Sequence, residues 1–178
     1  MQDTDKILIL DFGGQYSQLI ARRVRECNVY SMIKPHDVAL KEIEQEQPAG
    51  IIFSGGPRSV SIKNAPGVNP EIFKMGIPIL GICYGMHLMA SMMPGGKVEK
   101  AEHGEYGKAK MSIKEKGDLL AGIDSTTQVW MSHGDQVIQI PDGFNKMAET
   151  GITDVAAMGN EESKLYGVQF HPEVVHTL

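Results

Sequence analysis

The sequence contains little cysteine, no excess of basic residues and no long apolar run. Only 2 of its 178 residues are cysteines, so a disulfide framework is implausible and the fold depends on hydrophobic packing. Acidic residues outnumber basic ones by 22 to 17, a formal net charge of −5, and we therefore expect no nucleic-acid partner. The apolar runs are broken by glycine, proline or charge, so we expect no membrane partner.

Apart from these absences, the sequence has the composition of an ordinary globular domain. Hydrophobic residues make up 42% of the chain and charged residues 22%, which is close to the average for folded domains and excludes disorder. A chain of this length can bury a sufficient core without a metal or disulfide. The polar N-terminus leads straight into an apolar run, which does not resemble a secretory signal. We therefore expect one cytoplasmic domain spanning residues 1–178.

The apolar pattern of the first half predicts an α/β fold. Continuous apolar runs predict strands buried on both faces, and four stand out: Lys6–Leu10, Gly50–Phe53, Ile77–Ile82 and Leu165–Phe170. A further strand is expected at Asn28–Ile33, and helices are expected at Tyr16–Cys27, Val38–Gln47 and Tyr84–Met93. This alternation predicts a doubly wound, mostly parallel sheet flanked by helices.

The pattern changes in the second half of the chain. Short strand-like segments joined by turns replace the alternation, at Lys108–Ile113, Thr127–Met131, Gln136–Ile140, Met147–Thr150 and Val155–Met158. We expect these segments to form a small antiparallel extension of the main sheet, within the same domain.

Cys83 is the strongest candidate for a reactive residue. It lies between a predicted strand and a predicted helix in Gly81-Ile82-Cys83-Tyr84-Gly85, a pattern typical of a nucleophile elbow. The free N–H groups and the dipole of a helix N-terminus favour a thiolate there. A structural cysteine between small residues fits this short motif about equally well. Cys27 carries no such signal, and we expect it to be a partly buried structural thiol.

A thiolate nucleophile needs a general acid and base, and His171 is the histidine best placed to act as one. It follows a predicted buried strand, so we expect it at the same sheet edge as Cys83. Glu173, two residues further on, can bind the far imidazole nitrogen and fix the tautomer and orientation of the ring. Either residue alone can be structural, but the combination with Cys83 predicts a catalytic triad.

A glycine-rich loop, Ser54-Gly55-Gly56-Pro57, follows the strand predicted at Gly50–Phe53. Beside a cysteine nucleophile, the N–H groups of Gly56 and Tyr84 can bind the oxyanion of a tetrahedral intermediate. A phosphate-binding loop is the alternative, but the Gly-Lys-Ser/Thr pattern is missing. No histidine, cysteine and carboxylate set has the spacing of a metal site, so we expect no metal and no cofactor in this domain.

Together these motifs resemble the class I, triad-type glutamine amidotransferases, and more narrowly the GMP synthetase branch of that family. The matching segments cover nearly the whole chain: 9–16, 54–57, 81–85, 130–135 and 167–177. The resemblance assigns the triad to Cys83, His171 and Glu173, and the oxyanion hole to Gly56 and Tyr84. It therefore agrees with the roles inferred from the residues themselves.

The resemblance also implies an activity and a partner. The substrate would be L-glutamine, hydrolysed through a γ-glutamyl thioester on Cys83. The ammonia would pass to a synthetase domain of the ATP-pyrophosphatase type, which uses ATP and Mg to aminate XMP to GMP. That domain is absent from this sequence. Because the chain stops at Leu178, just after the matching His-Thr, we expect an excised N-terminal domain rather than a separate subunit.

Two positions depart from the family pattern. His87 stands where the family usually has a glutamine that helps to hold the substrate, and Gly104 stands where it often has an arginine. The resemblance places His87 among the substrate-binding residues, with Ser132 and His133, although His133 can also be read as an ordinary turn residue. We expect His87 to take over the substrate contact with some loss of affinity, since an imidazole has a shorter, planar reach.

Two other functions stay open at this point. A degenerate or regulatory domain would keep the fold but would have lost substrate binding. A free-standing γ-glutamyl cysteine hydrolase would act without a synthetase and would not respond to XMP or ATP.

Overall fold

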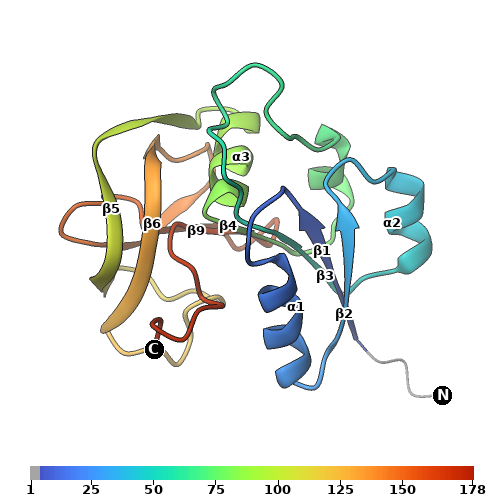
Figure 1. The fold of residues 1–178 in the computed structure, drawn as a ribbon, viewed down its shortest axis with the longest axis horizontal. Helices are drawn as coiled ribbons and strands as arrows, with labels where there is room; N and C mark the ends of the chain where they lie inside the picture. The colour runs from blue at the N-terminus through green and yellow to red at the C-terminus, as the bar shows by residue number, and fades with distance from the viewer. Residues whose placement is uncertain (1–4) are drawn as a thin grey trace.

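The computed structural model describes residues 5–178, which form a nine-stranded sheet with helices on both faces (Figure 1). The strand order is β2-β1-β3-β4-β9-β8-β7-β5-β6. The first five strands in this order pair in parallel: β2 (Tyr30–Pro35), β1 (Lys6–Asp11), β3 (Gly50–Phe53), β4 (Ile79–Ile82) and β9 (Leu165–Val168). The other four pair antiparallel: β8 (Ala157–Asn160), β7 (Asn145–Glu149), β5 (Lys97–Ile113) and β6 (Thr126–Gln139).

The helices cover the parallel strands from both sides. They are α1 (Ser17–Glu26), α2 (Leu40–Glu46) and α3 (Tyr84–Met92), with a 3-10 turn, η1, at Pro70–Lys74 before β4. Leu8 and Phe53 belong to the core cluster that includes α2 and α3, whereas Ile9 and Ile82 belong to the one that includes α1. Both faces of the parallel part of the sheet are therefore buried, which explains why the sequences of these strands are continuous apolar runs.

The expected α/β sheet with a parallel core and an antiparallel extension is confirmed, but the extension is larger than expected. The segment predicted at Lys108–Ile113 is only the end of the 17-residue strand β5. The segments predicted at Thr127–Met131 and Gln136–Ile140 belong to one strand, β6. Together β5 and β6 form a long ribbon at one side of the molecule (Figure 1).

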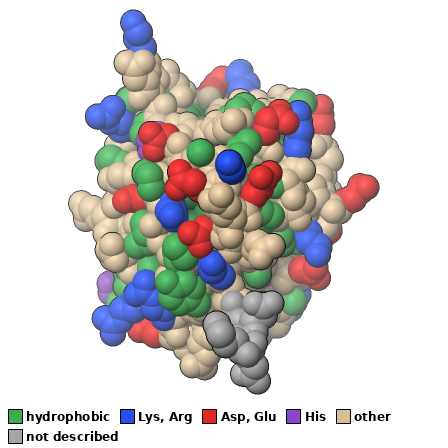
Figure 2. Space-filling model, turned by 90° about the vertical axis from the view of Figure 1, so that its right-hand side faces the viewer, with side chains coloured by type: hydrophobic (Ala, Val, Ile, Leu, Met, Phe, Trp, Pro, Cys, Tyr) green, Lys and Arg blue, Asp and Glu red, His purple; other side chains and the backbone are tan. Residues whose placement is uncertain are grey.

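The surface around α2 and β2 carries mixed charge. Figure 2 shows acidic and basic side chains interspersed there, and Lys34 forms salt bridges with Glu42 and Glu46. Within residues 5–178, no helix combines the length and the apolar character that a membrane crossing requires. Cys27, expected to be partly buried, is exposed, because it lies at the C-terminal end of α1, where residues 25–28 are all exposed.

Candidate active site

Cys83 sits on a tight turn between β4 and α3. Its backbone has a φ of +51° and a ψ of −102°, a combination that L residues rarely adopt and that is strained. A side chain at either flanking glycine would not fit. A Cβ on Gly81 would lie 2.6 Å from the Gly85 carbonyl, and one on Gly85 would lie 2.6 Å from the Phe53 carbonyl oxygen. The predicted elbow geometry is therefore present, with the thiol at the carboxyl edge of the sheet.

His171 and Glu173 follow β9, the strand that pairs with β4. The His171 Nδ1 atom is 2.8 Å from Oε1 of Glu173, and both side chains are buried. Two backbone contacts hold the histidine in place: its N–H donates to the Trp130 carbonyl at 3.0 Å, and the Thr177 hydroxyl donates to its carbonyl at 2.7 Å. The C-terminal His-Thr segment is thus part of the support of the site.

The protonation of His171 depends on its two partners. Burial by itself lowers the pKa of this ring, but the interactions with Cys83 and Glu173 outweigh burial and raise the pKa to about 10. The arrangement therefore places a charged imidazolium, which can give a proton to a leaving group, beside Cys83.

The loop after β3 brings backbone N–H groups to the same place. A Cβ on Gly55 would lie 3.2 Å from Cε1 of His171 and 3.9 Å from Cβ of Cys83, so this loop borders both residues. Gly56 packs against Tyr84, the first residue of α3, whose N–H lies in the helical turn where amides lack a helical acceptor. The two N–H groups predicted to bind an oxyanion therefore lie on segments that flank the thiol.

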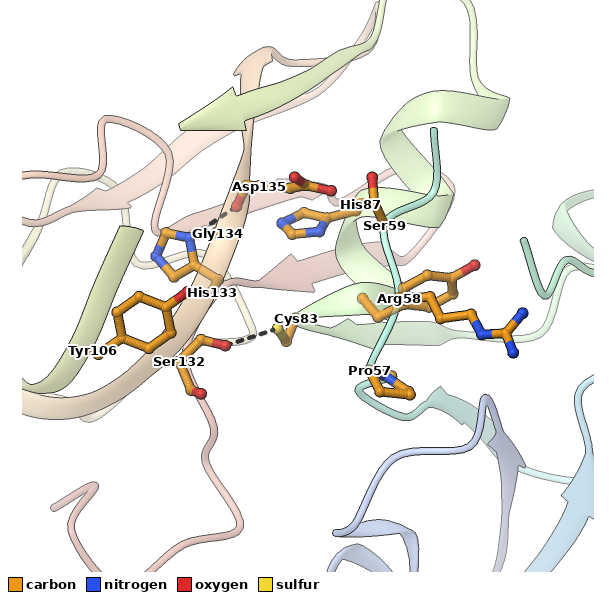
Figure 3. A pocket seen from close by; sticks show the side chains of 12 residues that line it. Pro57, Arg58, Ser59, Cys83, His87, Tyr106, Ser132, His133, Gly134 and Asp135 are labelled. Carbon is orange, nitrogen blue, oxygen red and sulfur yellow. Dashed lines mark hydrogen bonds between the residues drawn. The ribbon is translucent and has the colours of Figure 1, made fainter. Parts of the chain in front are cut away.

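The thiol opens into a cavity of about 370 Å³ (Figure 3). Its lining comes from the loop after β3, from the elbow and α3, and from the β5–β6 ribbon: Gly56–Ser59, Cys83, Tyr84, His87, Tyr106 and Ser132–Asp135. A smaller cavity of about 210 Å³ lies against His171 and the loop at 13–16, and it also reaches Cys83. Cys83 therefore borders both cavities.

The ribbon forms the wall that faces Cys83. The Cys83 thiol lies 3.8 Å from the carbonyl oxygen of Ser132, a contact that Figure 3 draws as a dashed line. The ring of His133 is buried, with Nδ1 2.8 Å from the carbonyl oxygen of Asp135 and Nε2 3.2 Å from Oγ1 of Thr153. Both ring nitrogens thus have protein partners, so His133 shapes this wall, and its predicted contact with a substrate stays a prediction.

A buried carboxylate supports this wall from behind. Glu105 on β5 accepts hydrogen bonds from the hydroxyls of Thr150 at 2.9 Å and Thr153 at 2.6 Å. These bonds tie the β7–β8 loop to the ribbon and place Thr153 against His133. Burial lowers the pKa of His133, although Asp135 and Glu105 act in the opposite direction.

Comparison with known proteins identifies this arrangement. The family model for class-I glutamine amidotransferases matches residues 8–178. The chain belongs to the class-I glutamine amidotransferase family. It is 67% identical over 174 residues to a glutamine-hydrolysing GMP synthase from Halothermothrix orenii, which covers 98% of the chain and 34% of the relative. For the corresponding protein from Clostridium tetani the identity is 56% over 171 residues, 96% of the chain and 33% of the relative.

A solved structure extends this relationship to the whole chain. A protein from Thermoplasma acidophilum, described as one subunit of a GMP synthase, is 31% identical, with a TM-score of 0.85. The match covers 99% of this chain and 88% of that protein. By contrast, this amidotransferase chain spans about a third of the length of its GMP synthase relatives.

The amidotransferase site also contains residues that sequence reasoning missed. His87 lines the cavity, and its Nε2 atom lies 2.7 Å from Oε1 of Gln169, a residue with no predicted role. Burial lowers the pKa of His87, and the bond with Gln169 offsets this only in part. The sequence does offer a signal for this contact, because Gln169 stands among apolar residues at the end of a predicted strand. A buried amide there needs hydrogen-bond partners. In residues 5–178, no cluster of three or more potential ligands could hold a metal ion.

Proposed function

We propose that this chain hydrolyses the side-chain amide of L-glutamine to glutamate and ammonia, with Cys83 as nucleophile. The observation that carries the proposal is the strained Cys83 elbow at the mouth of a cavity, beside a buried His171–Glu173 pair at 2.8 Å. Membership of the class-I glutamine amidotransferase family supports it. The intact set of three groups favours an active enzyme over a degenerate domain.

In the first half of the reaction, the Cys83 thiolate attacks the carbonyl carbon of the glutamine carboxamide. The oxygen of the tetrahedral intermediate becomes negative, and the N–H groups of Gly56 and Tyr84 stabilise it. The imidazolium of His171 then gives its proton to the amide nitrogen, the C–N bond breaks, and ammonia leaves. The product that stays behind is a γ-glutamyl thioester on Cys83.

In the second half, the now neutral His171 removes a proton from water, and the resulting hydroxide attacks the thioester carbonyl. The C–S bond breaks, glutamate leaves, and Cys83 returns to the thiolate beside a protonated His171. Glu173 accepts a hydrogen bond from Nδ1 throughout and stabilises the imidazolium in both halves. Neither half requires a cofactor.

The main cavity suits a small zwitterion. Among the described residues, Asp135 is the one acidic side chain in its lining, and it can receive the α-ammonium group of glutamine. His87 and Ser132 also line the cavity, so their predicted contacts with the substrate are sterically reasonable. We assign His133 to the wall behind these groups.

The ammonia would be used by a synthetase of the ATP-pyrophosphatase type, which binds ATP and Mg and aminates XMP to GMP. Similarity to glutamine-hydrolysing GMP synthases, of which this chain spans about a third, supports such a partner. In this proposal residues 1–178 act as the glutaminase domain, in the cytoplasm, either joined to the synthetase or bound to it as a separate chain.

A glutamine-like diazoketone tests the proposed site. The chain is incubated with 6-diazo-5-oxo-L-norleucine, with and without excess glutamine, and its intact mass is measured. The proposal predicts a single adduct that glutamine blocks and that Cys83→Ala abolishes. Cys27→Ser is the matched control, since Cys27 is an exposed thiol outside the cavity lining and its removal should change nothing.

An adduct that glutamine does not block, or that persists in Cys83→Ala, would contradict the proposal. Adding the synthetase part of a GMP synthase with ATP and XMP then tests the coupling. Faster release of ammonia supports the partnership, whereas an unchanged rate favours a free-standing γ-glutamyl hydrolase.

A further inference from the structure

Gln169 occupies a position that the mechanism above does not use. It is completely buried, directly after β9 and two residues before His171. Its peptide N–H donates to the Ala156 carbonyl at 2.9 Å, which fixes the backbone. Its side-chain amide lies between two groups of the site: Oε1 is 2.7 Å from Nε2 of His87, and Nε2 is 3.8 Å from Sγ of Cys83.

The chemistry of these atoms sets the direction of both hydrogen bonds. An amide oxygen only accepts, so Nε2 of His87 carries the hydrogen and donates to Gln169. The NH2 group of Gln169 then points to the sulfur and donates to it. The tautomer of His87 therefore determines which end of the amide faces the nucleophile.

The two polar contacts of the sulfur favour opposite protonation states. The Ser132 carbonyl accepts a hydrogen bond from a thiol, and it repels a thiolate. The Gln169 amide donates, and a donor binds a thiolate more strongly than a thiol. Since the proposed reaction begins with the thiolate, the Gln169 contact acts in its favour.

We propose that Gln169 is a further catalytic residue, which donates a hydrogen bond to the Cys83 thiolate, and that His87 is a positioning residue that holds the Gln169 amide in the donating orientation. This inference rests on the proposed function, because it assigns a role in activating the same nucleophile. It also gives His87 a second task beside the predicted substrate contact.

The rate of Cys83 alkylation by iodoacetamide, measured from pH 5 to pH 9, tests this role. On the acid side of the profile the rate follows the fraction of thiolate. Gln169→Met keeps the length of the side chain without the donor, and it should lower the acid-side rate about fivefold. All proteins carry Cys27→Ser, so that Cys83 is the one thiol, and Gln45→Met on the exposed face of α2 is the matched control.

Changes at His87 separate positioning from general structure. His87→Leu removes the donor that fixes the amide, and the acid-side rate should fall about threefold, whereas His87→Gln retains a donor and should stay near wild type. In the Gln169→Met background, His87→Leu should cause no further change, because its effect passes through Gln169. Other charged groups near these residues are His171 with Glu173, and His133 with Asp135, and all variants leave them in place.

An unchanged acid-side rate in Gln169→Met, with a normal thermal unfolding curve, overturns the inference. Equal and additive losses in the two single variants overturn the positioning role of His87. If Gln169→Met does not fold, His87→Leu against His87→Gln still decides, because both leave Gln169 intact. Failure here is distinct from failure of the proposed function, which shows as loss of the glutamine-protected diazoketone adduct in the otherwise unaltered chain.

Discussion

The parallel and antiparallel regions of the sheet contribute different parts of the candidate site. The parallel strands β3, β4 and β9 end at one edge, where they present Gly56, Cys83 and His171. The antiparallel ribbon β5–β6 contributes Tyr106 and the segment Ser132–Asp135 on the opposite side of the cavity. The groups proposed to react are thus held by strands buried on both faces, and the facing wall by a ribbon with one face in water.

This division predicts a separation of effects. In the proposed reaction, bond making and breaking depend on the spacing of Cys83, His171 and the N–H donors, which a rigid, dry sheet holds best. In the same proposal, recognition of the substrate depends on the ribbon and on His87. Changes on the parallel side should therefore lower kcat, whereas changes on the ribbon should act first on KM and on stability.

The largest expected effect is at Cys83. Cys83→Ala removes the group proposed to form the thioester, and glutaminase activity should fall by at least about 10⁴-fold. Ammonia release with the synthetase present measures this. Cys27→Ala should keep full activity, and a residual rate in Cys83→Ala above about a hundredth of wild type would show that the thiol is not the nucleophile.

Glu173 is the next test of the parallel side. Glu173→Gln retains the size of the side chain but removes the charge that stabilises the His171 imidazolium, so kcat should fall by about 10²-fold. KM for glutamine should stay within about twofold, because Glu173 does not line the cavity. A variant with altered KM and normal kcat would place Glu173 in substrate binding instead.

The ribbon is tested at Glu105. Glu105→Gln removes the charge of the carboxylate, whose Oε2 atom accepts from both threonine hydroxyls, so both bonds weaken and the free energy of unfolding should fall by about 1–3 kcal/mol. KM should rise, because the wall that carries His133 loses its support, while kcat changes less. Urea unfolding and steady-state kinetics measure both. Glu102→Gln, at an exposed position of the same strand, is the control and should leave both quantities unchanged.

The same contrast explains how much the sequence alone could predict. In the parallel region, both faces of each strand are buried, so the apolar runs at β1 and β3 mark the strands almost to the residue. Cys83 follows such a strand directly, and His171 and Glu173 come within five residues of the end of another, which is why their meeting point could be inferred. The observed strands differ from the predicted ones only at their ends. For example, the strand predicted at Ile77–Ile82 begins at Ile79, where pairing with β9 begins.

In the ribbon, the local pattern was misleading. β5 contains charged residues along most of its length, because much of the ribbon faces water, and its pairing with β6 shifts register between Lys100 and Glu105. The buried carboxylate of this strand, Glu105, looks in sequence like any other surface carboxylate. Its partners Thr150 and Thr153 are more than 40 residues away. Such a contact depends on the tertiary fold and has no local signature.

His87 lies between the two regions and gives a smaller effect. His87→Gln restores the residue usual in the family and offers both a donor toward Gln169 and an acceptor toward the substrate. KM for glutamine should fall about threefold, with kcat within about twofold of wild type. An unchanged or higher KM would contradict the predicted loss of affinity caused by the histidine.

The smallest expected effect is on the pH dependence of stability. Burial lowers the pKa values of His87 and His133, so below about pH 6.5 the unfolded chain binds protons that the folded chain does not. Stability therefore decreases as the pH is lowered below that value. The raised pKa of His171, about 10, acts in the opposite direction: its contribution is complete below about pH 6.5 and is lost as the pH rises toward 10.

Urea unfolding between pH 5 and pH 10 should therefore give a maximum near neutral pH. His87→Gln should flatten the acid side only, and His171→Asn the alkaline side only. Identical flattening of both sides by either variant would show that these buried rings do not titrate independently.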